Sequence, residues 1–275
     1  MTESKQTNPM ATLRVRYKMQ GTEAVRVRRD VPFPGATGER LLLDIYLPPE
    51  ARTPGPPPPC LVIVAGYPDE GFERIMGVRF KETGSSQSWA ELIAASGMAA
   101  VVYTNRDPVT DVRALLTHLQ TAASDLGIDP MRLGLWASSG NVPVALSLLM
   151  DRGLPPFACA ALCYGLTLDL DGHTEIADAA RQFRFRNPSE GKSVDDLPRN
   201  TPLYLLRAGQ DQMPGLNASM DRLIARALAL NLPVTVANYP DGVHAFDLTQ
   251  EGPGTGRVVG SLLAFLKAHM VAAAL

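Results

Sequence analysis

The sequence predicts an α/β fold built on one mostly parallel sheet, with antiparallel strands at its N-terminal end. From Cys60 onward, short apolar runs alternate with segments of helical spacing, an order that is typical of parallel strands joined by helices. Before Cys60, apolar residues stand at alternate positions, which indicates strands with one buried face. A proline-rich stretch at residues 54–59 separates the two parts and cannot join the interior of a sheet.

Bulk composition indicates one large core. The chain has 275 residues, of which 45 % are hydrophobic and 20 % charged. The net charge of −2 gives no indication of nucleic acid or an anionic membrane as the main partner. The odd set Cys60, Cys159 and Cys163 lies in or beside apolar runs, so we expect buried free thiols and a reducing compartment. Residues 1–10 lack the apolar run of a secretory signal, and residues 92–103 are too few to span a bilayer. We therefore expect a soluble, cytoplasmic protein without a membrane partner.

The N-terminal region is predicted to begin with a flexible tail over residues 1–11, followed by a single domain over residues 12–275. Residues 12–19 and 25–29 both alternate between apolar and polar, which predicts an antiparallel hairpin with one buried face. The arginines of this hairpin then form a solvated strand face rather than an anion site. A third strand is expected at residues 41–47.

The alternating region supplies the parallel part of the sheet. Strands are predicted at residues 60–65, 98–103, 132–136, 158–164, 203–208 and 234–238. Helices are predicted at residues 88–96, 109–126, 140–152, 218–230 and 255–270. Residues 166–200 break the alternation because they are polar and contain only a short helical piece at 176–185. We expect this stretch to be an insertion that forms a small cap above the sheet.

A serine pair stands where a strand of the predicted sheet turns into a helix, and ligands of such sheets bind at the carboxyl ends of strands. A nucleophile on this turn has a strained backbone, and small residues two before and two after it relieve crowding. For Ser139, Ala137 fits this requirement, but Asn141 replaces the second glycine. For Ser138, Gly140 fits, but a bulky tryptophan fills the other position. Serines there also often serve only as helix caps. We predict Ser139 as the nucleophile.

An aspartate and a histidine follow two later strands. Asp211 comes after the strand at 203–208, and His244 after the strand at 234–238. Alone, a loop aspartate is usually a turn former and a histidine a structural residue. Together with the serine they appear in the order serine, aspartate, histidine, each on a loop after a strand, which predicts a catalytic triad. Asp247 is a second acid close to the histidine, and we favour Asp211 over it.

Three segments resemble a known family. Residues 132–140 look like the nucleophile elbow of the α/β-hydrolase esterases, in the branch of dienelactone-hydrolase-like and small carboxylesterases. Residues 206–211 resemble the acid loop of that family, and residues 241–246 resemble its histidine loop. The resemblance covers residues 41–270 and implies an α/β-hydrolase fold. The sequence departs from the family at the elbow and in lacking a histidine–glycine run after residues 60–65.

The predicted chemistry is acyl transfer to a serine. His244 would take the proton of Ser139, and Asp211 would fix the histidine tautomer and stabilise the imidazolium. This predicts a serine hydrolase that cleaves carboxylic esters or lactones of small to moderate size. The alternatives are a peptidase or amidase with the same triad, and a catalytically silent protein that uses the fold to bind a ligand.

The oxyanion of the tetrahedral intermediate needs preorganised N–H donors. The Gly140 amide, at the start of the helix, is one predicted donor. The Tyr67 amide is the other, because Pro68 has no N–H. Asp69 and Glu70 follow directly, and we expect them to point away from an oxyanion or to pair with a cation, because negative charge opposes it.

The remaining predictions concern the pocket and its partners. Pocket walls are expected at three apolar or aromatic positions near the loops: Tyr164, Phe183 and Met213. No spacing of His, Cys, Asp or Glu suggests a metal site, and no early glycine-rich loop suggests a dinucleotide, so no cofactor is expected. The expected partner is a small ester molecule. The oligomeric state stays open, and a homo-oligomer is compatible with the sequence.

Overall fold

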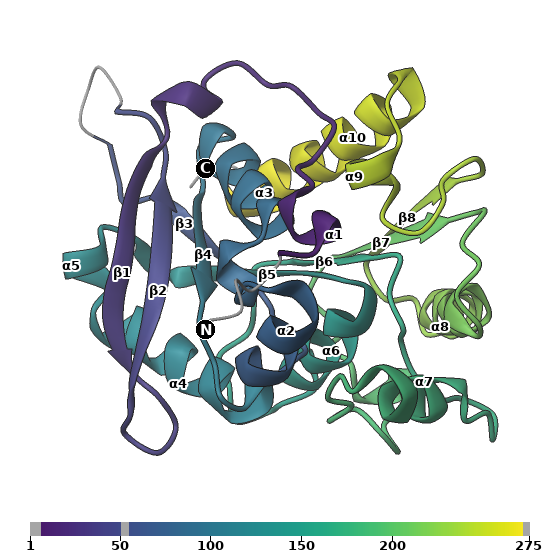
Figure 1. Cartoon of the computed structure of the whole chain (residues 1–275). Coiled ribbons are helices and arrows are strands. Elements are labelled where there is room, and N and C mark those ends of the chain that lie inside the picture. Colours follow the sequence, from purple (N-terminus) through teal and green to yellow (C-terminus); the bar gives the residue numbers. More distant parts are fainter. Residues whose placement is uncertain (1–6, 51–54, 272–275) are drawn as a thin grey trace, which may run out of the picture.

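The structure, a computed structural model, describes residues 7–50 and 55–271. These residues form an eight-stranded sheet with the strand order β1-β2-β4-β3-β5-β6-β7-β8 (Figure 1). The strands are β1 (Arg26–Pro34), β2 (Arg40–Leu47), β3 (Pro59–Ile63), β4 (Ala99–Tyr103), β5 (Asp129–Ser138), β6 (Ala160–Cys163), β7 (Leu203–Ala208) and β8 (Val234–Tyr239). Strand β2 runs antiparallel to both of its neighbours, β1 and β4, and all other pairs are parallel.

Helices cover both faces of this sheet. Helices α3 and α10 lie on one face, whereas α4, α6 and α8 lie on the other (Figure 1). The helices of eight or more residues are α2 (Asp69–Met76), α3 (Gly84–Ala95), α4 (Pro108–Thr121), α6 (Val142–Leu149), α7 (Glu175–Phe183), α8 (Leu216–Ala229) and α10 (Pro253–Met270). The shorter helices include α1 (Pro9–Thr12), α5 (Ala123–Leu126) and α9 (Phe246–Thr249). The predicted fold class, a mostly parallel sheet between helices with an antiparallel start, is confirmed.

The central strands form the core. Every residue of β3 and β4 is buried, as their continuous apolar sequence predicts for strands covered on both faces. The three cysteines are free and buried: Cys60 lies in β3, Cys159 directly before β6 and Cys163 at the end of β6. Residues 55–57 of the proline-rich stretch are exposed, while Pro59 already begins β3. Residue 54 lies outside the described residues.

The predicted N-terminal hairpin is wrong in its first strand. Residues 13–19 run extended but join no strand ladder, and β1 instead pairs with β2. The alternation has a different cause, because Val15 is buried against the core while its N–H donates to the Ser88 hydroxyl at 3.0 Å. Its neighbour Arg16 donates its N–H to the Asp247 carbonyl at 2.6 Å. A period of two therefore marks an extended chain with one packed side, which does not require a sheet partner.

Part of the segment predicted as a flexible tail, residues 1–11, has defined structure. Residues 1–6 lie outside the described residues, but Pro9–Thr12 form α1 and Ala11 is buried. The Asn8 side chain caps this helix by accepting the Met10 N–H at 3.0 Å. The Asn8 N–H also donates to the carbonyl of Met76, at the end of α2. A short polar segment is thus held in place by contacts that are distant in sequence.

The insertion at residues 166–200 joins β6 to β7 and contains α7. This helix ends at Phe183, two residues earlier than predicted, because Arg184 adopts a left-handed conformation with φ of 62°. The chain then reverses, and Phe185 is buried in a small apolar cluster separate from the main core. We call this the cap cluster, and its buried members are Leu166, Ile176, Ala179, Phe185 and Leu216.

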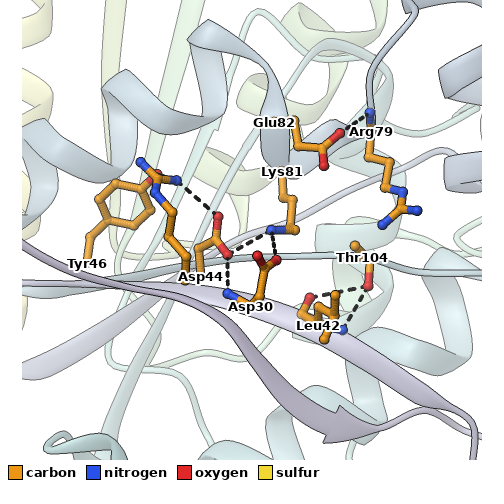
Figure 2. A network of polar contacts seen from close by, with 9 residues as sticks. Asp30, Leu42, Asp44, Tyr46, Arg79, Lys81, Glu82 and Thr104 are labelled. Carbon is orange, nitrogen blue, oxygen red and sulfur yellow. Dashed lines mark hydrogen bonds and ion pairs between the residues drawn. The ribbon is translucent and has the colours of Figure 1, made fainter.

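An ion cluster with a buried Lys81–Asp44 pair at its centre ties the β1–β2 edge to the segment before α3 (Figure 2). The ammonium group of Lys81 lies 2.8 Å from a carboxylate oxygen of Asp44 and 2.8 Å from one of Asp30. Arg29 contacts the other oxygen of Asp44 at 3.3 Å. Asp30 has φ of 54° at an irregularity of β1, and its N–H also donates to Asp44. We refer to Asp30, Asp44, Lys81 and Arg29 as the ion cluster.

Candidate active site

Ser139 occupies the sharp turn at the end of β5. Its φ of 55° lies in the left-handed region, which is costly for a non-glycine residue and typical of a strained functional turn. Ser138, the alternative nucleophile, is instead the last residue of β5 and has an ordinary extended backbone. The geometry of the turn therefore favours Ser139.

The predicted triad residues are brought together. The Ser139 hydroxyl oxygen lies 3.0 Å from His244 Nε2. His244 Nδ1 lies 2.7 Å from a carboxylate oxygen of Asp211. Because a carboxylate only accepts, Nδ1 carries the proton and Nε2 is free to accept the serine O–H. This is the hydrogen-bond chain that activates a serine for nucleophilic attack.

The loops that carry the acid and the base are themselves fixed. The Asp211 side chain is fully buried, and its second oxygen accepts the Met213 N–H at 2.9 Å. On the histidine loop, the Gln250 side chain accepts the Val243 N–H and donates to the Asp241 carbonyl, both at 3.0 Å. These contacts hold the loop shape on both sides of the triad hydrogen bond.

A second buried carboxylate lies behind the histidine. Asp247 accepts the Tyr164 O–H at 2.7 Å and the Trp89 indole N–H at 2.8 Å. The Tyr164 ring meets the His244 ring edge-on at 5.5 Å between centroids. Burial raises the pKa of the Asp247 carboxyl. Tyr164, predicted as a pocket wall, is only 3 % exposed, and its hydroxyl is directed into the protein.

Asn141, the departure from the usual glycine at the elbow, joins two loops of the site. Its side-chain oxygen accepts the Gly66 N–H at 2.7 Å, which connects the turn after β5 to the loop after β3. The backbones approach so closely that a Cβ on Gly66 would lie 2.4 Å from the Gly140 carbonyl oxygen. The Gly66 carbonyl in turn accepts the Arg186 N–H at 2.8 Å. In the sequence Asn141 is only a departure from the usual glycine, because its partner is 75 residues away.

The two predicted oxyanion donors lie at this junction. Among the described residues, neither the Gly140 N–H nor the Tyr67 N–H has a hydrogen-bond acceptor, so both remain free to bind a ligand oxygen. The Tyr67 side chain lies directly over Gly140. The acids of the loop point elsewhere: Asp69 accepts the N–H groups of Phe80 and Asn105, and Glu70 pairs with an arginine one helical turn away. Burial raises the pKa of Asp69 to about 6.

The other predicted pocket residues have different surroundings. Met213 is partly buried and packs against the cap cluster. Phe183 ends α7 and is 38 % exposed, outside that cluster. Phe185 lies over the site instead, with a ring carbon 3.1 Å from where a Gly140 Cβ would stand. Arg184, the left-handed residue between the two phenylalanines, reverses the chain so that Phe185 rather than Phe183 turns inward. No simple sequence pattern predicts a left-handed residue at this position.

Within residues 7–50 and 55–271, no group of three or more His, Cys, Asp or Glu side chains is arranged to bind a metal ion. In the same part of the chain, none of the helices combines the length and the apolar character needed to cross a bilayer.

The fold matches solved structures of esterases. A bacterial heroin esterase superposes with a TM-score of 0.67 at 19 % identity, covering 90 % of this chain and 86 % of that one. An α/β-hydrolase enzyme from the metagenome of Lake Arreo, Spain, gives 0.68 at 19 % identity, with 90 % and 83 % covered. A thermostable esterase from Pseudomonas putida gives 0.69 at 14 % identity, with 92 % and 86 % covered. No model of a known protein family matches the sequence, and no curated protein does. The chain therefore has the α/β-hydrolase fold.

Proposed function

We propose that this protein is a serine hydrolase that cleaves carboxylic esters, lactones included, of small to moderate size. The observation that carries the proposal is the hydrogen-bonded chain from Ser139 through His244 to Asp211. It lies at the carboxyl ends of β5, β7 and β8, where ligands bind in this kind of sheet. The fold is shared with solved esterases, which is consistent with this chemistry.

In this mechanism Ser139 adds to the ester carbonyl carbon while His244 takes its proton. The negative charge of Asp211 stabilises the imidazolium that results. The alcohol leaves with a proton from His244, and a water molecule activated by the same histidine hydrolyses the acyl-enzyme. The free N–H of Gly140 lies beside the nucleophile, where it can stabilise the oxyanion.

An active-site label tests the proposal directly. A fluorophosphonate probe should label the folded protein at Ser139, and Ser139→Ala should abolish both labelling and turnover of p-nitrophenyl esters. Ser138→Ala is the matched control and should keep both. Labelling at Ser138 would change only the identity of the nucleophile. A folded protein that neither reacts with the probe nor hydrolyses any ester would refute the proposal.

Substrate preference distinguishes ester hydrolysis from the alternative function, amide cleavage. A panel of p-nitrophenyl esters of rising acyl length, aryl esters, lactones and peptide p-nitroanilides should show activity concentrated on esters or lactones. Cleavage of the anilides at a comparable kcat/KM would favour the peptidase or amidase alternative with the same triad. The panel also identifies the acyl length that the site accepts.

A further inference from the structure

The phenolic hydroxyl of Tyr67 lies against the backbone beside the nucleophile. A Cβ placed on Gly140 would stand 2.5 Å from the Tyr67 hydroxyl oxygen and 3.2 Å from the ring carbon that bears it. The hydroxyl is thus in contact with the residue whose free N–H is the proposed oxyanion donor. Glycine at position 140 is required for this approach, since any side chain would displace the phenol.

This hydroxyl has no hydrogen-bond partner among the described residues. Its aromatic neighbours are Phe72 and Phe185, at 5.8 Å and 6.1 Å between ring centroids, and neither offers an acceptor. A phenol in such surroundings usually binds a polar partner. Burial raises the pKa of Tyr67 to about 12, so the group stays protonated and can donate at neutral pH.

The loop that carries the phenol is held in place before a substrate arrives. The N–H of Gly66 donates to Asn141, and its carbonyl accepts from Arg186, so both polar groups of the preceding residue are used. The ring also packs against both phenylalanines. A donor fixed in this way loses little freedom in the transition state, which is the condition for effective electrostatic stabilisation.

We infer that the Tyr67 O–H, in addition to backbone N–H groups, donates a hydrogen bond to the oxyanion formed at Ser139. The inference rests on the proposed hydrolase function. As Ser139 bonds to the carbonyl carbon, its proton passes to His244 and the carbonyl π electrons move to the oxygen. Tyr67 stabilises that charge without giving up its proton. When the electrons return, the bond to the alcohol breaks and the alcohol takes the proton from His244.

Tyr67→Phe in the full-length chain tests this inference, because it removes one oxygen and keeps the ring, its contacts and the backbone N–H. With a p-nitrophenyl ester that the wild type hydrolyses, we expect kcat to fall by about 10²-fold with KM little changed. Affinity for a trifluoromethyl ketone, which forms a tetrahedral oxyanion adduct, should fall by a similar factor. The matched control is Tyr204→Phe, which removes a hydroxyl that donates to Ser261 at 3.1 Å and should leave kcat unchanged.

The possible outcomes test the role of Tyr67 separately from the proposed hydrolase function. If wild-type turnover depends on Ser139 but Tyr67→Phe retains its kcat within twofold, the tyrosine role is overturned and the hydrolase function stands. A raised KM at unchanged kcat would also overturn it, because it would indicate a packing role in the pocket. If the wild type shows no serine-dependent turnover, the proposed function fails first.

Discussion

Two regions of this molecule bury carboxylates in different ways. In the ion cluster, Asp44 is held by Lys81 and Arg29, so its charge is matched by cations in direct contact. At the candidate active site, the acids accept hydrogen bonds from neutral donors: Asp211 from His244 and a backbone N–H, and Asp247 from a phenol and an indole. In the ion cluster the carboxylate charge is neutralised by the neighbouring cations. At the candidate active site the neutral donors leave the negative charge uncompensated.

The difference has a chemical consequence. A carboxylate already paired with a cation offers little further stabilisation to a charge that develops nearby. A carboxylate held by neutral donors keeps its negative potential, which His244 needs when it becomes an imidazolium. We therefore expect the ion cluster to contribute to stability and the triad to contribute to catalysis. Substitutions in the two regions should separate these two properties.

The largest effect is expected from His244→Ala. Removing the base should lower kcat/KM for an ester substrate by about 10⁴-fold or more, because the serine is then no longer activated. The thermal midpoint should change little, since the histidine is partly exposed. Steady-state kinetics and a melting curve on the same preparation check both expectations. His118→Ala, on α4, serves as the control and should be fully active; a His244→Ala protein with more than a tenth of wild-type activity would contradict the triad.

A substitution in the ion cluster should lower the stability of the protein and leave its activity unchanged. Lys81→Met leaves Asp44 buried without its closest cation, which should lower the free energy of unfolding by about 3–5 kcal/mol. Activity per folded molecule should be retained. Urea denaturation measures the first and active-site titration the second. The half-exposed Arg29 provides a comparison, because Arg29→Gln should cost less than about 1 kcal/mol.

A pH dependence is expected from Asp69, a further buried carboxyl, which is held by backbone N–H groups. Its pKa of about 6 exceeds the ordinary aspartate value of 3.8, so between these values the native state binds a proton that the unfolded state lacks. This stabilisation is present at pH 4 and is lost as the pH rises through 6, with a total of about 2–3 kcal/mol. The Asp69→Asn variant should lack this pH-dependent stabilisation. The difference in unfolding free energy between wild type and Asp69→Asn should therefore shift in favour of the wild type as the pH falls from 7 to 4, and a pH-independent difference would contradict the raised pKa.

The smallest effect is expected at Asn141. Asn141→Ala leaves the Gly66 N–H without its acceptor and loosens the loop that carries Tyr67, so kcat should fall about tenfold, equivalent to about 1.4 kcal/mol. Asn141→Asp keeps an acceptor oxygen and should retain more activity than the alanine variant. Equal activities of the two variants would show that the hydrogen bond does not position the loop.

Local patterns in the sequence predicted the part of the fold that local forces control. Continuous apolar runs identified β3 and β4 because strands buried on both faces need apolar side chains on both. The loops after β5, β7 and β8 could be placed since parallel strands end at the same edge, which brings Ser139, Asp211 and His244 together. Helix α2 was missed because its first residues, Asp69 to Gly71, are typical of a turn.

The sequence by itself determined the order of strands and helices and the three loops that carry the candidate triad, because periodicity and turn residues act over a few positions. Only the tertiary structure decided how distant segments meet. It placed residues 13–19 against α3 without a strand partner, turned Phe185 rather than Phe183 toward the site, and brought the Tyr67 hydroxyl onto Gly140. Such contacts depend on packing between elements far apart in the chain, and no local pattern encodes them.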